Sequence, residues 1–114
     1  MSEDCDVEDI AALLEDETVR AILTATSIEP MSANALSERC GASEPTIYRR
    51  LEDLRAYDLV ESQTRLDTAA GHHHKVYSPR LERVTVELVE GSLTVEVSRR
   101  EDVADRFTDL VEGM

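Results

Sequence analysis

Apolar positions in the first quarter of the chain recur every three or four residues, as they do on the buried face of a helix. A polar residue, Asp16, interrupts this pattern and is a suitable N-cap for a second helix. The pattern therefore predicts one broken helix or two abutting helices that end near Ser27 and are closed by Glu29-Pro30. The apolar positions are Val7, Ile10, Ala11, Leu14, Val19, Ile22 and Leu23.

Two further helices are predicted between Ser32 and Arg55. Ser32 is a suitable N-cap for the first, and Gly41 stops it. Ser43 caps the second, where Pro45 lies in the first turn. The expected inward positions are Ala35, Leu36 and Cys40 in the first helix and Ile47, Leu51 and Leu54 in the second.

After residue 59 the period changes from that of helices to that of strands. Residues 60–67 and 74–78 read as a hairpin around the small residues 68–71. Residues 84–88 and 93–97 read as a second hairpin, with Glu90-Gly91 as its turn. This turn places Leu88 opposite Leu93, Val86 opposite Val95 and Val84 opposite Val97, so that all six apolar side chains share one face.

The last apolar stripe predicts an amphipathic helix over residues 100–112. Its members, Val103, Phe107, Leu110 and Val111, follow helical spacing, and acidic residues occupy the first turn, where they suit the helix dipole. Since 114 residues suffice for one core, we expect a single domain over 1–114. Its parts are a core at 7–80, a hairpin at 82–99 and the helix at 100–112.

A family resemblance becomes specific between Ser32 and Leu51. The chain contains Leu36-Ser37, then Gly41-x-Ser43, then Thr46-Ile47-x-Arg49-x-Leu51. This series resembles the helix-turn-helix of haloarchaeal ArsR-like transcription regulators, and Leu59-Val60 is similar to their passage from recognition helix into wing. Asp58 stands where that family usually has glycine, and Asp tolerates left-handed angles better than most residues.

The resemblance implies an α+β winged helix-turn-helix fold, here with an N-terminal helical segment, a wing hairpin, an additional β-hairpin and a C-terminal amphipathic helix. It also implies sequence-specific binding to double-stranded DNA. Helix 44–55 would read the major groove, and the wing at 60–78 would contact the flanking groove or backbone.

The helical period assigns roles to individual residues. Arg49 can pair with guanine, and Thr46 can contact a base edge. Tyr48 and Arg50 can reach phosphates, as can the backbone N–H groups at Ser43. The candidate DNA-binding residues are Ser43, Pro45, Thr46, Tyr48, Arg49 and Arg50 in the helix and Arg65, His73 and Lys75 in the wing.

The charged residues are distributed unevenly along the chain. The chain has 25 acidic and 12 basic residues, a net charge of −13, and its composition resembles that of proteins from salt-accumulating haloarchaea. Residues 1–42 sum to −8, residues 81–114 to −5, and residues 43–80 to 0. We therefore expect a near-neutral reading surface on an acidic body.

Other chemistry is not indicated by the sequence. No phosphate-binding glycine loop, nucleophile elbow or zinc-hydrolase signature is present, so we predict no enzyme and no cofactor. Adjacent histidines at 72–74 alternate faces, and Cys40 lacks the neighbouring cysteine of metal-sensing ArsR members, so we predict no metal site. The absence of a long apolar run predicts a cytoplasmic protein without membrane association.

The sequence leaves the oligomeric state and two alternative functions open. A homodimer is expected through Ile10, Leu14, Phe107 and Leu110, although these stripes could instead pack within one subunit. The alternative function is a winged-helix protein-interaction module of the transcription machinery that binds a basic partner without reading DNA. A metal-responsive regulator is a weaker third option, and the sequence leaves any small-molecule effector unknown.

Overall fold

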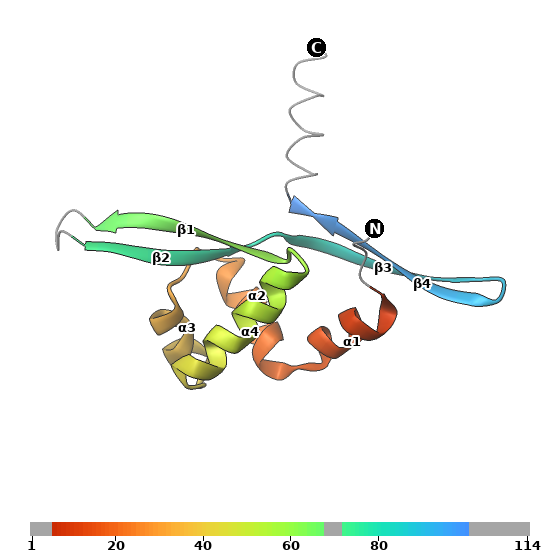
Figure 1. Ribbon diagram of the computed structural model, residues 1–114, viewed down its shortest axis with the longest axis horizontal. Coiled ribbons are helices and arrows are strands. Elements are labelled where there is room, and N and C mark those ends of the chain that lie inside the picture. Colours follow the sequence, from red (N-terminus) through yellow and green to blue (C-terminus); the bar gives the residue numbers. More distant parts are fainter. Residues whose placement is uncertain (1–5, 68–71, 101–114) are drawn as a thin grey trace, which may run out of the picture.

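The computed structural model describes residues 6–67 and 72–100 of the chain. Four helices are followed in the chain by two antiparallel hairpins, an α+β arrangement consistent with a winged helix-turn-helix. The helices lie on one side of the hairpins, which extend in opposite directions from the middle of the molecule (Figure 1). The elements are α1 (Val7–Glu15), α2 (Glu17–Thr26), α3 (Ala33–Cys40), α4 (Glu44–Ala56), β1 (Val60–Asp67), β2 (His72–Pro79), β3 (Leu81–Val89) and β4 (Ser92–Arg99).

The N-terminal helices abut at Asp16, as one of the two sequence alternatives predicts. Its backbone is extended, and its carboxylate accepts a hydrogen bond of 3.0 Å from the Val19 N–H. Asp16 thus ends α1 and starts α2 within one residue. The buried side chains of these helices include Ile10, Val19 and Ile22.

The helix-turn-helix of α3 and α4 is set by local capping. Ser32 accepts a hydrogen bond of 3.1 Å from the Ala35 N–H, and Gly41 ends α3 with a left-handed φ of +68°. Ser43 then caps α4, whose buried residues are Ile47, Leu51 and Leu54, as predicted.

The predicted inward stripe of α3 was partly wrong. Leu36 is buried, but its fully buried neighbour is Ala33, whereas Ala35 and Cys40 are half-buried. Ala33 lies three residues before Leu36 and shares its helix face, which packs against α2, α4 and β2.

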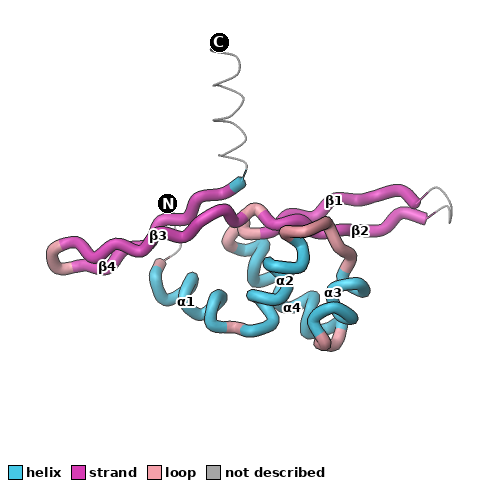
Figure 2. Tube along the Cα trace, turned by 180° about the vertical axis from the view of Figure 1, so that it is seen from behind, coloured by secondary structure: helices cyan, strands magenta, loops and turns pink. Residues whose placement is uncertain are grey.

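The wing hairpin pairs β1 with β2 and joins the helices through a short bridge. Met31 and Tyr77 exchange backbone hydrogen bonds of 3.1 and 2.8 Å just before α3. Tyr77 is buried in the same core cluster as the helices. The wing is therefore fixed at its base, and β1 and β2 continue past α3 (Figure 2).

The second hairpin has the predicted register. Val84 faces Val97, Val86 faces Val95 and Leu88 faces Leu93 across β3 and β4. At its base, the Arg99 guanidinium donates hydrogen bonds of 2.8 and 3.1 Å to the carbonyl oxygens of Tyr57 and Asp58. The second hairpin is thereby attached to the C-terminal end of α4.

The helix predicted over residues 100–112 lies, from residue 101 onward, outside the described residues. Among the described helices, none has the length and apolar character needed to cross a membrane.

Candidate nucleic-acid interface

The N-terminal half of α4 presents its polar face to solvent. Pro45, Tyr48 and Arg49 are exposed, and Thr46 is half-buried. Ile47 and Leu51, on the opposite face, have 0 and 2 % of their surface exposed. Because the buried face holds the helix in place, the exposed residues are presented in a defined orientation.

Ser43 and Thr46 are joined where α4 begins. The Ser43 hydroxyl accepts a hydrogen bond of 3.3 Å from the Thr46 N–H and donates one of 3.0 Å to the Thr46 hydroxyl. The Ser43 side chain is thus used for capping. Its backbone environment at the helix N-terminus remains suited to an anion.

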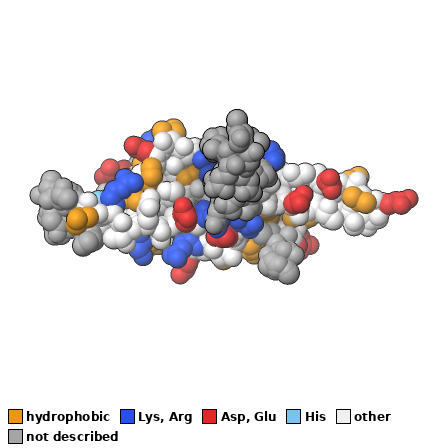
Figure 3. Space-filling view, turned by 90° about the horizontal axis from the view of Figure 1, so that it is seen from above, with side chains coloured by type: hydrophobic (Ala, Val, Ile, Leu, Met, Phe, Trp, Pro, Cys, Tyr) orange, Lys and Arg blue, Asp and Glu red, His pale blue; other side chains and the backbone are white. Residues whose placement is uncertain are grey.

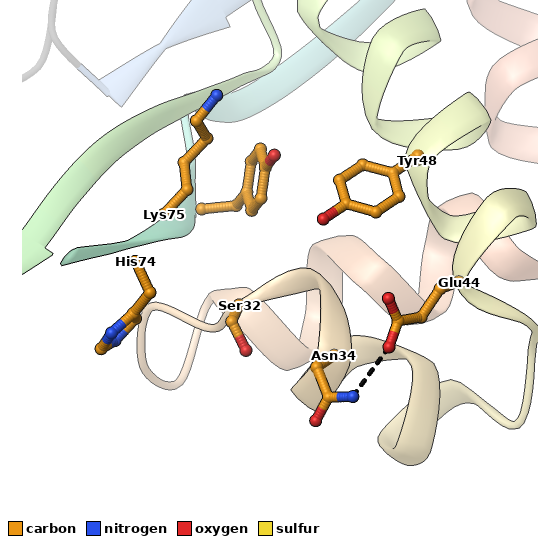
Figure 4. Close-up of a pocket in the computed structure, with 7 residues that line it drawn as sticks. Ser32, Asn34, Glu44, Tyr48, His74 and Lys75 are labelled. Atoms are coloured by element: carbon orange, nitrogen blue, oxygen red, sulfur yellow. Dashed lines mark hydrogen bonds between the residues drawn. The ribbon is translucent and has the colours of Figure 1, made fainter. Parts of the chain in front are cut away.

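A groove separates α4 from the wing strand β2 and contains two hollows, both of which are lined by Tyr48, Lys75 and Tyr77. The first has a volume of about 490 Å³, and the second about 260 Å³. Figure 4 shows the first hollow, with Tyr48 directed into it from α4 and Lys75 on the opposite wall, its amino group directed away from Asn34 and Glu44. We call the two together the α4–β2 groove, lined by Ser32, Asn34, Glu44, Tyr48, Arg49, Leu51, Glu52, Arg55, His74, Lys75 and Tyr77.

Three cations surround the second hollow. Arg49 and Arg55 come from α4, and Lys75 comes from β2. Among the described residues, none of these three forms an ion pair. Their charges are therefore available to an anionic ligand.

Arg55 and Tyr77 are groove residues that the sequence analysis missed. Arg55 follows Tyr48 by seven residues and so lies on the same helix face, a signal that the helical period could have provided. The place of Tyr77 in the groove depends on the packing of β2 against the helices, which no local sequence pattern indicates. Burial of this side chain raises the pKa of the Tyr77 phenol above its ordinary value.

Two carboxylates also border the groove. Glu44 accepts a hydrogen bond of 2.7 Å from the Asn34 amide, drawn as a dashed line in Figure 4. Glu52 is exposed beside the second hollow. These acids keep the groove close to neutral, in agreement with the zero charge sum of residues 43–80.

Arg50 points to a different part of the molecule from Arg49. Its Nε lies 2.9 Å from an Asp16 carboxylate oxygen, and its Nη1 lies 3.7 Å from Asp53. The Val19 N–H and the Arg50 guanidinium hold the pKa of Asp16 below its ordinary value. Arg50 therefore links α4 to the junction of α1 and α2, and this engagement does not favour its predicted phosphate contact.

The wing residues are only partly brought together. Lys75 and His74 line the groove, whereas Arg65 is exposed on β1 and lines neither hollow. His73 pairs with Leu66 through its backbone, and its side chain lies outside the described part of the chain. Within that part, no three His, Cys, Asp or Glu side chains are arranged to hold a metal ion.

Of the four predicted dimer residues, the described structure contains Ile10 and Leu14. Ile10 is 3 % exposed and belongs to the chain's own core, which is the alternative that the sequence left open for it. Leu14 packs half-buried against that core. Phe107 and Leu110 lie outside the described residues.

A family comparison agrees with this geometry. Residues 14–63 match the model of a helix-turn-helix domain, a stretch that contains α2, α3 and α4 and ends within β1. No curated protein matches the chain. The part of the chain that carries the exposed face of α4 is thus similar to a helix-turn-helix domain.

Proposed function

We propose that the chain, with its helix-turn-helix segment at residues 14–63, is a cytoplasmic transcription regulator that binds double-stranded DNA in a sequence-specific manner. The observation that carries this proposal is the exposure of Arg49 beside Pro45 and Thr46 on a helix whose other face is buried. In helix-turn-helix proteins, the N-terminal part of the second helix contacts base edges in the major groove.

Arg49 is the proposed base reader. A guanidinium can donate two parallel hydrogen bonds to O6 and N7 of guanine, which no other base pair reproduces. Thr46, one turn earlier, would contact a base edge or a thymine methyl group. Sequence preference then depends on two residues that share the exposed face of α4.

The α4–β2 groove is the proposed phosphate contact. Lys75 on the wing and Arg55 on α4 supply positive charge from two sides, and the Tyr48 hydroxyl supplies a neutral donor between them. Such contacts fix the position and orientation of the protein on the duplex without reading sequence. Arg65 and His73 would extend the contact along the wing.

Selection of bound duplexes from a random library, followed by titration of the preferred site, tests this function. We expect Arg49→Ala to weaken binding by about 1–3 kcal/mol and to relax the preference at one position of each half-site. Arg83→Ala is the matched control, because Arg83 is exposed on β3 and lines neither hollow of the groove.

Selection of no preferred sequence by the wild-type chain would contradict the proposal. Equal losses of DNA-binding affinity in Arg49→Ala and Arg83→Ala would contradict it as well.

We further propose that the chain acts as a homodimer on a pseudopalindromic site. Two recognition helices would then enter major grooves about 34 Å apart, one turn of the duplex. A dimer doubles the number of base contacts, which supports specificity when each near-neutral groove binds phosphates only weakly.

A second candidate function is protein interaction within the transcription machinery. The net charge of −13 favours it, because an acidic surface can bind a basic partner. Charge reversal at Glu87 and Glu96 on the second hairpin should abolish such binding, whereas Arg49→Ala should leave it intact. Function that is lost with Arg49→Ala and kept with the charge reversals supports the reading of DNA.

A further inference from the structure

The outer half of the β3–β4 hairpin exposes apolar side chains that no described element covers. Val86, Leu88 and Leu93 have 56, 83 and 52 % of their surface exposed. Nearer the base, Val84, Val95 and Val97 are partly buried against the core. One apolar face therefore begins in the core and continues uncovered along the hairpin.

Strand alternation separates this face from the polar one. The six apolar residues pair with one another across the strands. The other face carries charged residues, which include Arg83, Glu87 and Glu96. Viewed from above, the outer part of the hairpin shows hydrophobic and acidic side chains and no Lys or Arg (Figure 3).

A two-stranded hairpin with an uncovered apolar face is only marginally stable in water. Contiguous exposed apolar surface of this kind marks an interaction site more often than a free surface. A regular hairpin with such an uncovered face from Val84 to Val97 therefore favours a partner that covers it.

From these observations we infer that the apolar face of the β3–β4 hairpin binds the same face of a second copy of the chain. The face bears no charge, so a charged partner would bury its charges without counterions. A second copy presents a matching uncharged face, and a two-fold axis makes such contacts self-complementary.

The position of the hairpin agrees with this arrangement. β3–β4 extends away from the wing and from α3, toward the opposite end of the molecule (Figure 1). Pairing at that end leaves the exposed face of α4 and the wing accessible in both copies. The contact would continue onto α1, which packs beside β4.

This dimer surface does not rest on DNA binding. It differs from the surface expected from the sequence, because it assigns the contact to Val86, Leu88 and Leu93 and not to Ile10, which is in the core. Measurement of the dimer in the absence of DNA therefore tests it separately from the proposed function.

Sedimentation equilibrium of the intact chain provides the test. We expect the wild-type chain to be dimeric and Leu88→Glu to raise the dissociation constant roughly a hundredfold or more, since two unpaired carboxylates would be buried. Leu88→Gln, which adds no charge, should weaken the dimer less. Leu88 is 83 % exposed in one chain and lies outside the core cluster, so these variants should keep the folded helices of the wild type, which circular dichroism checks.

Val89→Glu is the matched control. Val89 is also exposed on β3, but it pairs with Ser92 on the opposite face. We expect this variant to dimerise like the wild type. Equal weakening by Leu88→Glu and Val89→Glu would overturn the inference.

The salt dependence of the dimer dissociation constant provides a second test. Two copies that each carry −13 repel, and apolar contact is strengthened when salt screens that repulsion. The dissociation constant should therefore fall as KCl rises. A constant that rises with KCl would overturn the apolar contact.

A wild-type chain that remains monomeric at all salt concentrations would also overturn the inference.

Discussion

Asp58 adopts an unfavourable left-handed backbone conformation, and its side chain forms an ion pair. Its φ of +62° places it in the left-handed region at the turn from α4 to β1. Its carboxylate pairs with Arg80, and Arg99 donates to its carbonyl oxygen. The aspartate thus allows the turn, and its carboxylate adds an ion pair with Arg80, directly before β3, that glycine could not form.

Substitution of Asp58 should separate these two contributions. Asp58→Ala removes the ion pair and still has to adopt the left-handed conformation, which is unfavourable for alanine. Asp58→Gly also removes the ion pair, but glycine adopts this conformation without strain. We expect the alanine variant to be less stable than the glycine variant by about 1 kcal/mol in urea unfolding. Equal stabilities of the two variants would mean that the turn conformation costs nothing.

The adjacent arginines of α4 show what the sequence could not predict. Arg49 and Arg50 are equivalent candidates in the sequence, but successive helix positions differ by about 100°. That rotation leaves Arg49 exposed above the groove and directs Arg50 to Asp16. The partner of Arg50 is 34 positions away in the chain, and only the packing of α4 against the N-terminal helices reveals it.

At the scale of elements, Asp16 and Arg50 hold three helices together. Asp16 ends α1, caps α2 and pairs with α4 through Arg50. One carboxylate therefore contacts all three helices at the point where α4 packs against the N-terminal pair.

Acid unfolding should reveal this link. Because the folded pKa of Asp16 is lowered, its contribution is fully present above the ordinary value of 3.8 and is lost as pH falls through the folded value. Asp16→Asn retains capping ability, and we expect it to be less stable at pH 7 and to lose less stability below pH 3.8. Asp53→Asn, at the longer distance of 3.7 Å from Arg50, is the control. Wild-type acid sensitivity in Asp16→Asn would contradict the role of this carboxylate.

Local signals predicted most elements well. Caps at Ser32 and Ser43, the stop at Gly41 and the register from Glu90-Gly91 all depend on neighbouring residues, and the structure confirms them. Contacts between distant elements were not predictable in this way. Arg99 binds the end of α4 across more than forty residues, and no local pattern indicates that contact.

At the scale of the molecule, the base of the second hairpin is bonded to the C-terminal end of α4. Arg99 and Arg80 join the base of β3–β4 to Tyr57 and Asp58, immediately after α4. A dimer formed through the outer hairpins would therefore set the distance between two α4 helices. That distance must match the spacing of major grooves on one face of the duplex.

The charge distribution predicts an unusual response of DNA binding to salt. Counterion release gives a log–log slope of about −0.9 for each phosphate neutralised. Since residues 43–80 sum to zero, we expect a shallower slope than that of repressors making about 6–10 phosphate contacts. Titration of the preferred duplex over a range of KCl concentrations measures it, and a slope as steep as that of a basic repressor would contradict this expectation.

Genome-wide occupancy of the intact chain in cells at their native salt concentration tests the central claim most directly. We predict discrete pseudopalindromic sites for the wild type and for Arg83→Ala, and loss of those sites for Arg49→Ala. Occupancy that is unchanged by Arg49→Ala, or that shows no preferred sequence, would contradict reading of DNA by α4.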